Sequence, residues 1–319
     1  MTRPIQLSDQ SVIQDQPLTF VSRTKGSDGI RPTYILEQKR TVRNLVIFAL
    51  VVLASGWLGY GLDRLLNNPP GQQLGLLLWL VAPLITALLL RIFAGDGWKD
   101  FGLKPSIKGN GVWYAASILI YPLVALLVLT IGGVLGLVTF GDFSPTLLLS
   151  VFAAALVPSF IKNIFEEFAW RGYLAPKVHS LGLSAYVSHT IVGLIWGCWH
   201  IPYLLFLVDP TLLPATTTQS MVTFIPLMIA GLVAASIVYG ELRLLTNSVW
   251  SAVLLHTMGN VFVDVLILQG LFKIVPGMDF LLSPGPQSLL TMSIFVLIGI
   301  GLHQLRTTKQ LAVDAKAGR

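Results

Sequence analysis

Three short motifs place ionisable and amide side chains inside long apolar segments of the sequence. In the first, Glu166 and Glu167 are adjacent and Arg171 follows. Two neighbouring carboxylates in a poorly solvated site repel each other and lose hydration, which suits a general base working near neutrality. On a helix Glu167 and Arg171 share a face, so we expect Arg171 to neutralise Glu167 and to leave Glu166 free, with Lys162 as the alternative partner of Glu166. Taken alone, the motif fits a snorkelling charge cluster at a helix end equally well.

The other two motifs contain histidine. His256 and Asn260 are four residues apart, and Asp264 lies one turn further along the same stripe, where we expect an indirect role at most. An imidazole and a carboxamide side by side can donate hydrogen bonds to an anionic oxygen. Hydrogen bonding between helices is an equally common use of these residues in membranes. His200 follows Trp196 by four residues, so the indole can pack beside the imidazole and hold its orientation.

The remaining candidates point to packing rather than chemistry. Cys198 is the only cysteine, which excludes an internal disulfide and a cysteine-rich zinc cluster. A lone buried thiol is usually inert. We expect His179, His189 and His303, near helix ends, to be interfacial.

The elements that must position these motifs are membrane-spanning helices. Of 319 residues, 54% are hydrophobic and 11% are charged, and the mean hydropathy is +0.74. Soluble domains carry about 25% charged residues because their surface faces water. Apolar runs of about 20 residues predict spanning helices, which we assign to Leu45–Leu62, Leu74–Phe93, Val112–Phe140, Thr146–Phe165, Ala185–Val208, Met221–Tyr239, Val249–Leu268 and Leu289–His303.

The predicted fold class is therefore all-α: a polytopic membrane bundle of about eight helices with an intramembrane active-site cavity. The third predicted span, Val112–Phe140, is long enough to tilt or to include a re-entrant part. The spans define a transmembrane region over 44–305, between a polar tail at 1–43 and a basic tail at 306–319.

The distribution of basic residues predicts the orientation of this bundle. Alternate segments hold 18 Lys and Arg on one side and 2 on the other. Since cytoplasmic loops collect these residues, we expect both termini in the cytoplasm of a multi-pass protein in the cell membrane, most consistent with a bacterial inner membrane. The net charge of +6 follows from this topology and needs no nucleic-acid partner. Residues 1–43 lack the apolar core of a signal peptide, so the first helix must serve for insertion.

The three motifs together resemble a known family. Glu166-Glu167-x-x-x-Arg171, Trp196-x-x-x-His200 and His256-x-x-x-Asn260 are similar to the motifs of the CAAX protease and bacteriocin-processing (CPBP) intramembrane proteases, which include type II CAAX prenyl endopeptidases. Their order and their placement on the fourth, fifth and seventh of eight helices agree with that family, as does the stretch 97–103. Trp196 stands where the family usually has phenylalanine, so an aromatic ring is kept.

The resemblance implies a hydrolytic mechanism with named roles. Glu166 would activate a water molecule with help from His200, and His256 and Asn260 would stabilise the oxyanion of the tetrahedral intermediate. Glu167, Arg171 and Trp196 would support these groups.

The family is commonly labelled metalloprotease, which raises the question of a metal. Glu166, His200 and His256 could supply three ligands to a divalent metal such as zinc, with one position left open. Asn260 is a poor zinc ligand and a good oxyanion donor, so we favour water activated by glutamate without an obligatory metal.

The resemblance implies that the substrate is a membrane-embedded or lipidated peptide or protein. Its identity stays open between a peptide pheromone, a bacteriocin leader, another membrane protein and an exogenous toxin. No feature of the sequence indicates a prenyl-binding site. The sequence lacks the His-Glu-x-x-His motif, which excludes the zinc proteases built on that motif. An intramembrane aspartyl protease needs two aspartates within the spans, and only Asp264 lies clearly within one. Two further hypotheses stay open: a non-proteolytic membrane scaffold, such as a bacteriocin immunity protein, and a small-solute transporter with a polar pathway.

Overall fold

The computed structural model describes residues 32–68, 74–142 and 144–317. Over these residues it has eight helices long and apolar enough to cross a membrane, which confirms the predicted all-α fold class. The spans are formed by α1 (Pro32–Leu66), α2 (Leu74–Phe93), α3 (Gly111–Val134), α4 (Pro145–Ala169), α6 (Ala185–Pro202), α8 (Met221–Thr246), α9 (Trp250–Met258) and α12 (Leu289–Ala317).

Three of these spans continue through π-helical turns. The chain passes from α4 into η1 (Trp170–Leu174) and α5 (Ala175–His179), and from α6 into η2 (Tyr203–Leu207). The seventh span continues through η3 (Gly259–Val263) into α10 (Asp264–Leu268). Such wide turns inside α-helices often occur at functional sites.

Local sequence explains where two of the spans that carry motifs begin. Ser144 caps α4 by accepting a hydrogen bond from the backbone N–H of Leu147, and Pro145 occupies the first turn, where a missing N–H costs nothing. Ser184 caps α6 in the same way through the N–H of Val187.

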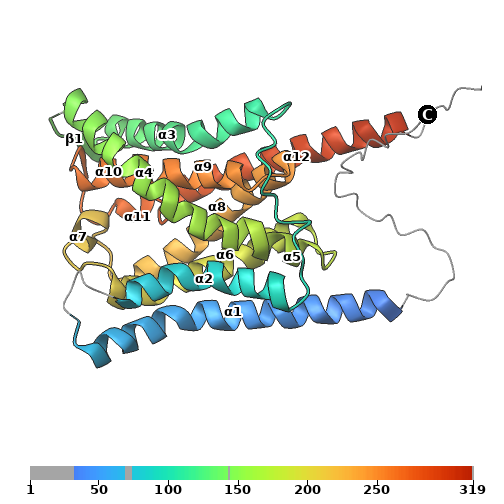
Figure 1. The fold of residues 1–319 in the computed structure, drawn as a ribbon. Coiled ribbons are helices and arrows are strands. Elements are labelled where there is room, and N and C mark those ends of the chain that lie inside the picture. The colour runs from blue at the N-terminus through green and yellow to red at the C-terminus, as the bar shows by residue number, and fades with distance from the viewer. Residues whose placement is uncertain (1–31, 69–73, 143, 318–319) are drawn as a thin grey trace, which may run out of the picture.

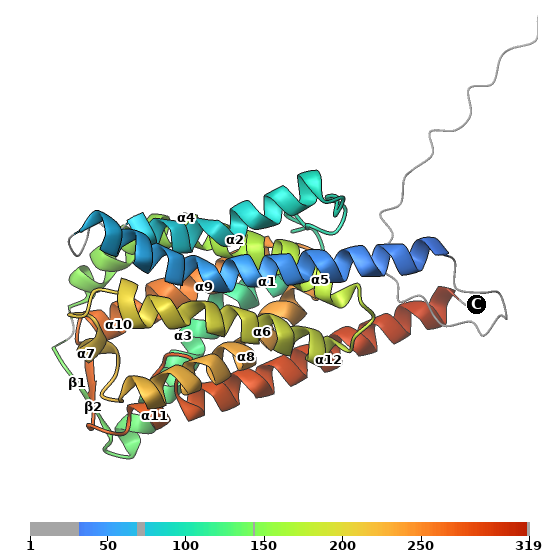
Figure 2. The ribbon, with the colours of Figure 1, turned by 90° about the horizontal axis from the view of Figure 1, so that it is seen from below.

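The spans lie side by side in a bundle, with α1 and α3 at opposite edges in Figure 1. Pro32 of α1 and Ala317 of α12 lie at one end of the bundle, which we call the terminal end (Figures 1 and 2). The opposite end, the far end, carries the short helices α7 (Leu213–Thr216) and α11 (Asp279–Leu282) and the strands β1 (Val138–Phe140) and β2 (Phe272–Ile274).

The structure corrects the end of the third predicted span. α3 stops at Val134, and Gly136 follows with φ +70°, a conformation that ends a helix without steric cost. Residues 138–140 then form β1, which pairs antiparallel with β2 in a two-stranded sheet. The apolar run that suggested a tilted or re-entrant helix is therefore a helix followed by a strand.

Several helices extend beyond the ends that the sequence predicted. The fourth span runs through the Glu166 motif to His179, and α8 continues past Tyr239 to Thr246. α1 begins at Pro32 and α12 extends to Ala317, so residues 32–43 and 306–317 of the predicted tails are helical. Residues 1–31 lie outside the described part of the chain. In the fourth span, the ion pairs Lys162–Glu166 and Glu167–Arg171 join neighbouring turns and neutralise charges within the helix.

Buried charge also occurs outside the three motifs. Glu241 on α8 is fully buried and binds three cations or imidazoles: His189 at 3.2 Å, His303 at 2.9 Å and Arg306 at 2.6 Å. His189, which we expected to be interfacial, is buried with 4% of its surface exposed. This cluster ties α6, α8 and α12 together near the terminal end.

Candidate active site

Each of the two adjacent glutamates forms an ion pair, Glu166 with Lys162 and Glu167 with Arg171. Arg171 Nη1 donates to the two carboxylate oxygens of Glu167 at 3.0 and 3.1 Å, and neither side chain is exposed. Lys162 Nζ contacts Glu166 Oε1 at 2.7 Å, so Glu166 is not left free. The other oxygen of Glu166 accepts a hydrogen bond from Trp196 Nε1 at 3.2 Å.

The guanidinium of Arg171 also lies between two aromatic rings. Its Cζ is 4.4 Å from the ring centroid of Trp196 and 4.3 Å from that of Tyr239. A cation over an aromatic face is attracted by the ring quadrupole, and this attraction is strongest where water is excluded. Arg171 therefore connects the fourth span to α6 and α8 behind the site.

His256 is oriented by Glu167. Its Nδ1 lies 2.8 Å from Glu167 Oε1, and the imidazole stands edge-on to the rings of Trp196 and Tyr239 at 5.4 and 5.8 Å between centroids. With Nδ1 bonded to a carboxylate, Nε2 is the nitrogen available for chemistry, and the carboxylate stabilises a positive charge on the ring.

Asn260 is held by a second amide. Its Nδ2 donates to Asn163 Oδ1 at 3.1 Å, and Asn163 Nδ2 donates to Thr257 Oγ1 at 3.4 Å. Asn260 lies in η3, whose wide turn directly follows the α9 helix that carries His256. We did not single out Asn163 as a site residue, although an amide inside the fourth span was a usable signal.

His200 is oriented by its own helix and by aromatic rings. Its Nδ1 donates to the carbonyl oxygen of Trp196 at 2.8 Å, which leaves Nε2 with its lone pair. Trp79 on α2 stands edge-on to His200 and stacks on Trp199 at 3.8 Å between centroids. The indole N–H of Trp79 also donates to the carbonyl of Trp199 at 2.9 Å. Nothing in the sequence pointed to Trp79, because it lies in an ordinary apolar run that only the tertiary structure brings to the motif.

One cavity of about 490 Å³ joins the three motifs. Its lining includes Trp196, His200, His256 and Asn260, together with Lys162. Glu166 itself is 1% exposed and lies directly behind Lys162 and Trp196. His200 therefore lines the same cavity as His256 and Asn260, although they lie on different spans.

The cavity extends towards the far end of the bundle. Its lining continues from α6 through η2 to Val208 and reaches Leu212 and Gln287, in segments next to α7 and α12. The fully buried Tyr239 also lines the cavity, and the fully buried Arg171 contacts its ring. Most other lining side chains are aliphatic or aromatic.

In the part of the chain that the structure describes, no group of three His, Cys, Asp or Glu residues is placed to hold a metal ion. The two oxygens of Glu166 face N–H donors, which compete with a metal for the same lone pairs. The side chain of Asp264 is outside the described atoms, and Cys198 is half-buried.

Comparison with known proteins agrees with this geometry. Residues 144–262 match the model of a family described as type II CAAX prenyl endopeptidase Rce1-like, and this segment contains all three motifs. A comparison with curated proteins gives no match. The region from α4 to η3 is therefore similar to the Rce1-like family of type II CAAX prenyl endopeptidases, a protease family, as the motifs predicted.

Proposed function

We propose that the protein is an intramembrane endopeptidase that hydrolyses a peptide bond with a water molecule activated by Glu166 and His200. The observation that carries the proposal is the convergence of His200, His256 and Asn260 on one cavity, with Glu166 directly behind its wall. The family match supports peptide-bond hydrolysis as the reaction class.

The geometry supports separate roles for the two histidines. His200 has Nε2 free as an acceptor, so it can hold the attacking water and share its proton with Glu166. The water oxygen then bonds to the scissile carbonyl carbon, and the proton passes to the leaving amine. For Glu166 to take part, the Lys162 ammonium has to move from its carboxylate; the side chain of Lys162 is 38% exposed at the cavity wall.

The oxyanion formed in this step needs hydrogen-bond donors. His256 would donate from Nε2, which requires a proton on that nitrogen, and the Asn260 amide would donate from Nδ2. Glu167 and Arg171 support the site by holding His256 in place. No metal is required in this scheme, and the donor set described above favours the metal-independent form.

The proposed substrate is a membrane-embedded or lipidated peptide or protein, because the cavity wall is largely apolar and lies within the spans. We place both termini in the cytoplasm on the charge distribution, since alternate segments hold 18 and 2 basic residues. The main alternative is a non-proteolytic scaffold, such as an immunity protein, that uses the cavity for binding alone. A transporter is disfavoured because the polar residues converge at one place.

The test compares purified wild type with Glu166→Gln on a library of quenched-fluorescent peptides, including lipidated and transmembrane peptides, with and without a chelator. Glu37→Gln, on the exposed face of α1, is the matched control. Cleavage by wild type and Glu37→Gln but not by folded Glu166→Gln is the expected result. Equal cleavage by all three would refute the role of Glu166, and loss of activity with chelator would refute the metal-independent scheme.

A further inference from the structure

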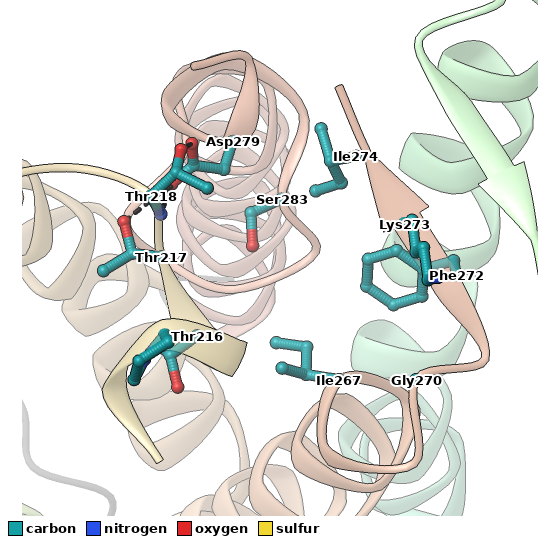
Figure 3. A pocket seen from close by; sticks show the side chains of 11 residues that line it. Thr216, Thr217, Thr218, Ile267, Gly270, Phe272, Lys273, Ile274, Asp279 and Ser283 are labelled. Carbon is teal, nitrogen blue, oxygen red and sulfur yellow. Dashed lines mark hydrogen bonds between the residues drawn. The ribbon is translucent and has the colours of Figure 1, made fainter. Parts of the chain in front are cut away.

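A second cavity adjoins the candidate active site at the far end of the bundle. It has a volume of about 320 Å³ and shares Thr216 and Ile267 with the lining of the catalytic cavity. Figure 3 shows this space between α7, the start of α11 and strand β2. We call it the outer lobe; its wall contains Thr216–Thr218, Ile267, Gly270, Phe272–Ile274 and Asp279.

One wall of the outer lobe is a strand with an unpaired edge. β2 pairs only with β1 among the described residues, and β1 lies on the side of β2 away from the lobe in Figure 3. The backbone N–H of Gly141 donates to Leu271 at 3.0 Å, and that of Val275 donates to Leu137 at 3.0 Å. These two bonds flank the paired strands and establish which residues of β2 face β1.

In an antiparallel pair, hydrogen-bonded and non-hydrogen-bonded positions alternate. Leu271 and Val275 form backbone hydrogen bonds with the β1 segment, so the backbone groups of Lys273, midway between them, also point towards β1. The N–H and C=O groups of Phe272 and Ile274 therefore point to the opposite edge. An exposed strand edge of this kind is a template for pairing with another extended chain.

The opposite wall is held rigidly by Asp279. Thr217 Oγ1 donates to its carboxylate at 2.6 Å and the Thr218 N–H at 3.1 Å, and the Thr218 hydroxyl also donates to it. Gln219 Nε2 adds a bond at 3.0 Å. Burial opposes ionisation of Asp279, but these bonds outweigh burial and lower its pKa. The segment between α7 and α8 is thus fixed opposite the open edge of β2.

We propose that the outer lobe is a substrate subsite, in which the stretch of polypeptide flanking the scissile bond binds in extended form by adding a strand to the open edge of β2. This inference rests on the proposed function and narrows its substrate class. The substrate continues for several residues beyond the cut towards the far end, and that flank is extended rather than helical. The shared residues Thr216 and Ile267 make the path from the catalytic cavity continuous.

The protein-side test uses two substitutions at one position. Ile274→Pro removes an N–H that points to the open edge, while the bonds of Lys273 and Val275 to β1 remain. Ile274→Ala removes the side chain and keeps the N–H, so it is the matched control. The substrate is a quenched-fluorescent peptide cut by wild type, in a version with a long flank and a version without it.

We expect Ile274→Pro to raise KM for the long peptide about two- to tenfold relative to Ile274→Ala, the loss of about one hydrogen bond. The short peptide should not distinguish the two variants. A second test needs no variant: N-methylation of single flank amides should weaken binding to wild type at alternate positions only, because only every second amide faces β2.

Equal kinetics for both variants on both peptides, together with insensitivity to N-methylation, would refute the proposed subsite. The proposed protease activity would be unaffected by that result. If folded wild type cuts no peptide of either length, the proposed function fails and the subsite fails with it. The apparent Tm of each variant shows whether a loss of activity reflects unfolding.

Discussion

Replacement of Glu167 by glutamine should destabilise the protein far more than an exposed Glu-to-Gln change. Arg171 is fully buried, and Glu167 is its only charged partner among the described residues. The Nε and Nη2 atoms of Arg171 have no hydrogen-bond partner in the described part of the chain. Its positive charge is therefore stabilised mainly by Glu167 and by the rings of Trp196 and Tyr239.

Removing one member of a buried ion pair leaves an uncompensated charge, which costs about 3–5 kcal/mol. The glutamine amide oxygen can still accept one hydrogen bond, so we expect the lower part of this range for Glu167→Gln. At about 2 °C per kcal/mol for a protein of this size, this lower part corresponds to a fall in the apparent Tm of roughly 6–8 °C. Arg171→Met should lower the free energy of unfolding by a similar amount, because the buried Glu167 carboxylate then keeps only His256 as a partner.

The double variant Glu167→Gln/Arg171→Met separates stability from function. With both charges removed, the apparent Tm should return to within a few degrees of wild type, because a buried pair contributes little beyond an apolar replacement. Peptide cleavage should stay low, since His256 has lost the carboxylate that orients it.

The assay is thermal unfolding in detergent alongside peptide cleavage, with Glu37→Gln as the exposed control. An apparent Tm for Glu167→Gln equal to that of the control would refute the argument that the pair is buried and coupled. Full activity in the double variant would refute the orientation of His256 by Glu167.

Three further predictions address other parts of the molecule. Trp79→Ala should lower kcat by roughly ten- to a hundredfold with a smaller change in KM, because the ring that stands beside His200 is lost; an unchanged kcat counts against that role. Asp279→Asn should destabilise the far end at neutral pH. Because the folded-state pKa of Asp279 is lowered, this difference is present above the usual aspartate range and disappears as pH falls through the folded pKa, which denaturation at several pH values measures. In a Cys198→Ser background, a membrane-impermeant maleimide should label Thr211→Cys in intact cells and Lys99→Cys only after permeabilisation; the reverse pattern would invert the proposed orientation.

Much of the fold followed from hydrophobic length alone. Eight apolar runs predicted eight spans, because a helix is the simplest way to satisfy the backbone within lipid. The ends were less predictable. The fourth span continues past Phe165 because Glu167 and Arg171 pair within the helix, and the third stops early because β1 finds a partner about 135 residues later in β2.

The sequence by itself determined which chemical groups are available: a glutamate pair, two histidines and an amide at helical spacings, on separate spans. Only the tertiary structure decided how they are used. In the folded bundle, Lys162 and Trp196 donate hydrogen bonds to Glu166. Glu167 binds both Arg171 and His256. The ring of Trp79 packs beside His200. Spacing along one helix determines which side chains share a face, but partners on other helices depend on how the bundle packs, and no local pattern records that.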